Sequence, residues 1–170
     1  MSEQLDQAKT NHLAKNNSLP KIAIIGIGNE LNGDDAAGVL IVRKIKNNLP
    51  ENKQILIVEG SIAPENYTGV IRNFKPDWIW LFDAADLGDK PGSVQLIDLE
   101  KVQSIGADTH RLAPTLLLSF LSLEMEFKAF LFGINPESVE PFTEVSDTIE
   151  KSIENTSKFF LLWLKNTYNI

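Results

Sequence analysis

Short apolar runs alternate with longer amphipathic segments along most of this chain. The apolar runs predict strands over 22–27, 54–59, 78–83, 93–98 and 128–133. Apolar residues at helical spacing predict helices over 36–47, 64–73, 114–123 and 145–165. Strands that alternate with helices are typical of an α/β fold. We therefore expect a three-layer α/β/α sandwich around a five-stranded, mostly parallel, twisted sheet.

Two segments refine this prediction. Residues 86–92, between the third and fourth predicted strands, are too few for the crossover helix that parallel neighbours require. The fourth strand should therefore be antiparallel and lie at an edge of the sheet. The last predicted helix carries an apolar stripe that favours packing on the core over binding a partner. Its members are Val145, Ile149, Ile153, Phe160, Trp163 and Leu164.

The first twenty residues differ from the rest in composition. Residues 1–20 are polar and rich in Asn, Lys and Gln, which predicts a flexible tail with at most a fraying helical turn. His12 lies in this segment, and we expect no ligand role for it. A chain of 170 residues suits one hydrophobic core, so residues 21–170 are expected to form a single domain.

Composition excludes several classes of function. The net charge is −7 and no basic run is present, so we expect no nucleic-acid partner. No apolar run reaches membrane-spanning length and the N-terminus lacks a signal-peptide core, so we expect no membrane partner and a cytoplasmic location. The absence of cysteine excludes disulfides, thiolate nucleophiles and cysteine-ligated metal sites.

The first predicted strand leads into a glycine turn that only partly matches a dinucleotide-binding fingerprint. Gly26 and Gly28 suit a tight turn, but Leu31 stands where that fingerprint has its third glycine. The carboxylates of Asp34 and Asp35 follow, where phosphates would lie, and like charges repel. The turn is therefore expected to bind something cationic.

Further candidate ligands lie at a second strand end and in a loop. Asp83 closes the very apolar strand 78–83, and it would share a crevice with Asp35 if the first and third strands are neighbours. His110 lies in an irregular stretch before the helix predicted over 114–123. Two carboxylates and one imidazole form a plausible ligand set for a borderline divalent metal, with positions left open for ligands from a partner.

Each of these residues also fits a structural role. Asp34 or Asp35 could cap the following helix, or Asp34 could cap it while Asp35 faces the crevice. Asp83 could accept hydrogen bonds from loop N–H groups, and His110 could simply face solvent. Spacing alone leaves both interpretations open.

The combination of motifs resembles the hydrogenase maturation endopeptidases, which trim the C-terminus of the large subunit of nickel–iron hydrogenases. The resemblance extends from about Lys21 to about Leu164. The segment 60–66 is similar to the branch that processes hydrogenase-3-type enzymes. The resemblance depends on Gly26-Ile27-Gly28-Asn29, Asp34-Asp35, Gly38, Phe82-Asp83-Ala84 and Thr109-His110.

This resemblance implies a site and a substrate. It assigns Asp35, Asp83 and His110 as catalytic residues and nickel ligands, although some members carry Glu where this chain has Asp35. The nickel would arrive already inserted in the large-subunit precursor, so the isolated protein is expected to be metal-free. It is also expected to be a monomer, as small proteases that bind a partner often are. Cleavage would release a short C-terminal peptide. A protease without cysteine would avoid stripping nickel from the precursor thiolates.

Several alternatives remain at this stage. Nickel could polarise the scissile carbonyl or activate water, or it could serve for recognition while a carboxylate acts as the base. The same ligands would suit a nickel-sensing assembly chaperone that cuts nothing. A nucleotide-binding enzyme would place Glu59 on a ribose but lacks the phosphate loop. A conventional zinc peptidase is disfavoured because the sequence has no His-Glu-x-x-His motif.

Overall fold

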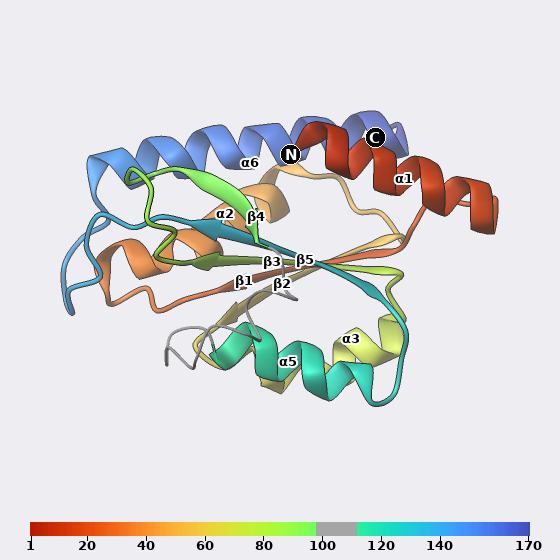
Figure 1. Cartoon of the computed structure of the whole chain (residues 1–170), viewed down its shortest axis with the longest axis horizontal. Helices are drawn as coiled ribbons and strands as arrows, with labels where there is room; N and C mark the ends of the chain where they lie inside the picture. The colour runs from red at the N-terminus through yellow and green to blue at the C-terminus, as the bar shows by residue number, and fades with distance from the viewer. Residues whose placement is uncertain (98–111) are drawn as a thin grey trace.

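The computed structural model describes residues 1–97 and 112–170, which form one five-stranded sheet with helices on both faces (Figure 1). The strand order is β2-β1-β3-β5-β4, and every neighbouring pair is parallel except β4 and β5. This confirms the predicted mostly parallel sheet with an antiparallel edge strand. The strands are β1 (Ile22–Ile27), β2 (Ile55–Ser61), β3 (Trp78–Ala84), β4 (Val94–Ile97) and β5 (Lys128–Ile134).

The central strands β1 and β3 are almost entirely apolar, with Asp83 as the charged exception, because helices cover both of their faces. Every residue of β1 and of β3 is buried, as expected for strands inside a parallel sheet. The edge strand β4 is short and only partly buried. The parallel pairing of β1 with β3 places Gly26 opposite Phe82, so the two strands end side by side.

The helices form the two outer layers. On one face of the sheet lie α1 (Ser2–Asn16), α2 (Ala37–Asn48) and α6 (Asp147–Tyr168), and on the other lie α3 (Thr68–Phe74) and α5 (Leu112–Ser122) (Figure 1). Short 3-10 turns, η1 (Gly33–Ala36) and η2 (Pro64–Tyr67), precede α2 and α3. In residues 1–97 and 112–170, no helix has both the length and the apolar character that a membrane span needs.

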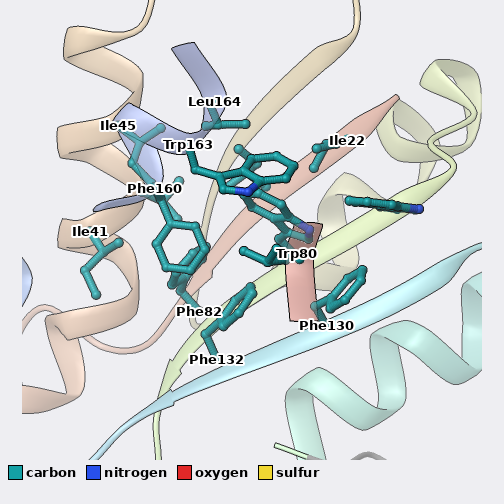
Figure 2. Packing of buried hydrophobic residues seen from close by; sticks show 14 of the residues in the cluster. Ile22, Ile41, Ile45, Trp80, Phe82, Phe130, Phe132, Phe160, Trp163 and Leu164 are labelled. Atoms are coloured by element: carbon teal, nitrogen blue, oxygen red, sulfur yellow. The ribbon is translucent and has the colours of Figure 1, made fainter. Parts of the chain in front are cut away.

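Aromatic side chains fill the space between the sheet and α6 (Figure 2). The Phe160 ring lies 4.7 Å from the Phe132 ring and 4.8 Å from the Phe82 ring, centroid to centroid, with edge-to-face geometry. Trp80 meets the same Phe160 ring at 5.3 Å. Such contacts add to the burial energy of each ring. The apolar stripe of α6 therefore packs on the core, as its spacing predicts.

The N-terminal segment corrects the sequence-based prediction, because it forms the helix α1 instead of a flexible tail. Leu5 is fully buried against the core that contains α6. The indole N–H of Trp163 donates a hydrogen bond to Asp6 Oδ1 at 3.0 Å. His12 packs edge-on against the Trp78 ring at 5.9 Å. Although the segment is polar overall, these contacts hold α1 against the core of the domain.

Candidate functional site

The turn after β1 brings the acidic pair back against the end of the strand. Gly28 has a φ of +137°, and a Cβ at this position would lie 1.8 Å from the carbonyl oxygen of Asp35. Only glycine allows this approach. The backbone N–H of Asn29 then donates to Asp35 Oδ2 at 2.8 Å. The glycine turn therefore fixes the Asp35 carboxylate beside the carboxyl end of the sheet.

Asp34 does not cap the following helix, which was one of the roles that the sequence suggested. Neither η1 nor α2 has a side-chain cap, so the capping hypothesis is wrong for both members of the pair. The Asp34 carboxylate is buried and instead accepts hydrogen bonds from the loop that follows β5. The donors are Glu137 N–H and Ser138 N–H at 2.9 Å, Ser146 N–H at 2.7 Å and Ser146 Oγ at 3.1 Å.

This anchoring was missed at the sequence level because its partners lie far along the chain. Asp34 and Ser138 are separated by 104 residues, and no local pattern encodes such a pair. Ser146 itself carries a weak signal, since a serine directly before an apolar helical pattern suits an N-cap. Its hydroxyl does accept a hydrogen bond from Ile149 N–H at the start of α6.

Asp35 and Asp83 come together at the ends of β1 and β3, as the sequence predicts for neighbouring strands. Asp83 is 7% exposed. Burial raises the pKa of the Asp83 carboxyl to about 7, and the nearby charge of Asp35 adds to the effect. A hydrogen bond from the Ala84 backbone opposes the shift but does not cancel it. The pair is therefore an electrostatically strained acidic site.

An arriving cation would relieve this strain, because it would favour the ionised form of Asp83 and neutralise the repulsion from Asp35. Alternatively, the Asp83 carboxyl could hold a proton near neutral pH, which would suit acid–base chemistry. The third predicted site residue, His110, lies outside the described residues. Within the described parts of the chain, no three His, Asp or Glu side chains cluster in a way that could hold a metal ion.

The structure also accounts for Glu59, the residue at the ribose position of the rival nucleotide-binding hypothesis. Its carboxylate pairs with Arg43 Nε and with Lys46 Nζ, each at 2.8 Å. The hydrogen bonds from Lys46 and then Arg43 lower the pKa of Glu59. Arg43 also binds Glu30 through both terminal nitrogens. Glu59 therefore serves a surface ion-pair network, which leaves the nucleotide hypothesis without support.

The fold and this edge define a class of protein: a three-layer α/β protein with a carboxylate site beyond the carboxyl ends of two parallel strands. The sequence profile of the HycI hydrogenase maturation proteases matches residues 39–162. The chain belongs to this family of hydrogenase maturation proteases, and it is a peptidase.

Individual relatives agree with this assignment. The hydrogenase 3 maturation protease of Escherichia coli strain K12 is 28% identical over 144 residues, which cover 84% of this chain and 90% of the relative. The hydrogenase 2 maturation protease of the same strain is 30% identical over 140 residues, covering 79% and 84%. The crystal structure of the NiFe hydrogenase maturation protease HycI from Thermococcus kodakarensis KOD1 superimposes with a TM-score of 0.79. It is 32% identical, and the match covers 86% of this chain and 94% of that one.

Proposed function

We propose that this protein removes a C-terminal peptide from the precursor of a nickel–iron hydrogenase large subunit after nickel insertion, and that it recognises the inserted nickel. The observation that carries the proposal is the proximity of Asp35 and Asp83, two carboxylates held together although their charges repel. Membership of the hydrogenase maturation protease family supplies the substrate class.

Asp35 and Asp83 would offer oxygen ligands to nickel that the precursor already holds. The raised pKa of Asp83 means that the metal-free site disfavours two negative charges, so binding of a divalent ion is coupled to loss of a proton. A precursor without nickel would leave the charge repulsion uncompensated. Discrimination between loaded and empty precursor would follow from this difference.

His110 is proposed as the third ligand, on the strength of the family resemblance alone. Oxygen ligands with one imidazole bind nickel less tightly than a set of thiolates would. The precursor would therefore keep its nickel during processing. In the hydrolytic step that we propose, the substrate's nickel acts as a Lewis acid near the scissile bond while the two carboxylates hold it in place.

The first prediction tests these three residues by substitution. Asp35→Asn, Asp83→Asn and His110→Ala should each reduce processing of a nickel-loaded precursor by more than about 100-fold. Loss of a residue that only supports a metal ligand already lowers metal affinity or activity by about 10–100-fold, so loss of a ligand itself should have a larger effect. Mass spectrometry of the precursor measures the loss of the C-terminal peptide. Asp89→Asn is the matched control, since Asp89 is an exposed carboxylate in the loop after β3 and should tolerate the change.

The outcomes separate the competing functions. Wild-type rates in all three variants would rule out the proposed site. A precursor that binds wild-type protein in the presence of nickel but never changes mass would indicate a nickel-sensing chaperone in place of a protease. A thermal shift on addition of a nicotinamide dinucleotide would revive the nucleotide-binding alternative.

A further inference from the structure

Three apolar side chains are exposed beside the acidic site. Phe142 is 86% exposed, Leu31 is 61% exposed and Val139 is 41% exposed. They lie on two adjoining segments, because the N–H of Phe142 donates to the carbonyl oxygen of Leu31. We call Leu31, Val139 and Phe142 the apolar rim. Exposed apolar groups that cluster in this way mark interaction surfaces more often than isolated ones do.

The loop 135–146, which carries Val139 and Phe142 of the apolar rim, is held by hydrogen bonds to Asp34. The buried Asp34 carboxylate binds the loop at Glu137, Ser138 and Ser146. Phe142 itself has a φ of +60°, a conformation that bulky side chains rarely adopt. Because the Phe142 ring is 86% exposed, its packing adds little to the stability of the isolated fold. Such backbone outliers persist where surrounding contacts fix them, and they cluster at functional sites.

The same loop is strongly acidic. Glu137, Glu140 and Glu144 of the loop and Asp147 at the start of α6 are all exposed, and the segment 135–147 contains neither Lys nor Arg. No ion pair involves any of these four carboxylates in the described part of the chain. A surface that complements this loop would combine an apolar pocket with surrounding basic side chains.

The loop is continuous with the candidate site. It begins directly after β5, where Gly133 pairs with Asp83. Its anchor, Asp34, directly precedes Asp35 in the chain. In the described part of the chain, a partner that lay on the apolar rim would therefore lie next to the edge that carries Asp35 and Asp83. The loop after β5 and the turn after β1 lie together at the carboxyl ends of the strands (Figure 1, left).

We propose that the apolar rim and its acidic loop are a preformed docking surface for the folded body of the precursor. The partner would insert an apolar pocket over Phe142 and face the loop carboxylates with Lys or Arg side chains. This inference rests on the proposed function, since the precursor is its occupant. A rigid loop binds at a lower entropic cost than a flexible one, and a central aromatic side chain is a common binding hot spot.

The second prediction tests this surface with steady-state processing of nickel-loaded precursor. Phe142→Ala should raise KM about tenfold while kcat changes less than about twofold, because the ring contributes to docking and not to hydrolysis. Phe142→Leu should recover most of the affinity. Leu162→Ala is the matched control, because Leu162 is an exposed apolar residue on α6, 53% accessible, and should leave KM unchanged. The double variant Glu140→Gln/Glu144→Gln should weaken the dependence of KM on salt.

The possible results lead to different conclusions. A KM for Phe142→Ala equal to that of the wild type would overturn the docking surface while leaving the proposed function intact. An equal rise in KM for Leu162→Ala would show a general effect of apolar truncation and would also overturn it. If the wild-type protein cuts no nickel-loaded precursor, the proposed function fails first and the docking surface falls with it.

Discussion

Asp34 and Asp35 are adjacent in sequence but face different surroundings. Asp34 is 1% exposed and its oxygens accept four hydrogen bonds from one loop. Asp35 is partly exposed, and its charge acts on Asp83. A buried carboxylate is tolerated when N–H groups surround it, whereas a carboxylate beside another one is tolerated only at an energetic cost. The first residue thus supports structure, and the second supplies the candidate site.

The third prediction concerns the pH dependence of Asp83. In the folded protein its pKa is about 7, against an ordinary value of 3.8. At pH values between about 4 and 7, the Asp83 carboxyl keeps its proton in the folded state but has lost it in the unfolded state. Asp83 therefore makes the free energy of unfolding fall as the pH rises through this range. Asp83→Asn removes this effect. The variant should match wild type near pH 4 and exceed its stability by up to about 4 kcal/mol at pH 8.

Urea unfolding at pH 4 and pH 8, with a chelator present, measures this difference. Asp89→Asn is again the control, because the pKa of Asp89 is lowered, chiefly by a hydrogen bond from the Lys90 backbone. Its substitution should give no gain at high pH. If Asp83→Asn were equally or less stable than wild type at pH 8, Asp83 would not be electrostatically strained. A gain in stability with a loss of processing would be typical of a functional site.

At the scale of elements, the close packing of α2 on the sheet sets the position of the candidate site. A Cβ on Gly38 would lie 2.2 Å from the Phe82 carbonyl oxygen and 2.4 Å from that of Ile27. These carbonyls belong to the ends of β3 and β1, directly before Asp83 and Gly28. Helix and strands can approach this closely only because Gly38 has no side chain.

The fourth prediction follows from this contact. Gly38→Ala should lower the free energy of unfolding by about 3 kcal/mol, because the backbone of two central strands must move away from α2. It should also reduce processing, since the ends of β1 and β3 would separate from the turn. Gly69→Ala is the matched control, because Gly69 lies in α3 and a Cβ added to it would meet no atom within 4 Å. That change should be neutral or stabilising by up to about 1 kcal/mol.

Chemical denaturation and the precursor-cleavage assay together check both glycine variants. Equal stabilities of Gly38→Ala and wild type would mean that α2 does not rest directly on the strand carbonyls. If Gly69→Ala lost as much stability as Gly38→Ala, the protein would tolerate alanine poorly at glycine positions in general. The loss in Gly38→Ala would then not be evidence for close packing of α2 on the strands.

At the scale of the whole molecule, α1 adds a helix to the layer that contains α2 and α6 (Figure 1). Its contacts involve Leu5 in the core, Asp6 on Trp163 and the Lys9 ammonium 5.3 Å from the Trp163 ring. The helix therefore covers aromatic residues that would otherwise meet water. It contributes none of the groups that form the Asp35–Asp83 site.

The fifth prediction tests whether α1 stabilises the molecule. Leu5→Ala should lower the free energy of unfolding by about 3 kcal/mol, as expected for truncation of a fully buried leucine. Leu13→Ala, on the same helix at 37% exposure, should change it by less than about 1 kcal/mol. Urea denaturation followed by tryptophan fluorescence measures both. Processing should be unaffected in either variant, and identical stabilities would contradict the docked helix.

Much of this architecture could be predicted from the sequence. Apolar runs and helical periodicity are local properties, so they located the five strands, the helices after residue 21 and the antiparallel edge strand. The ends of parallel strands share an edge of the sheet, so Asp35 and Asp83 could be expected to meet. The role of His110 stays a prediction, because it lies outside the described residues.

Long-range contacts account for what the sequence could not supply. The polar composition of residues 1–20 predicted a flexible tail. The segment is instead the docked helix α1, because Leu5 is buried against a core formed largely by later residues. The Asp34 carboxylate accepts a hydrogen bond from the backbone N–H of Glu137, 103 residues further along the chain. This long-range contact gives Asp34 a structural role that Asp35 does not share. Local pattern thus determined the elements and the candidate chemistry. Tertiary structure decided which carboxylate supports a loop and which faces Asp83, because the burial of each carboxylate and its protein hydrogen-bond partners are set only when the chain folds.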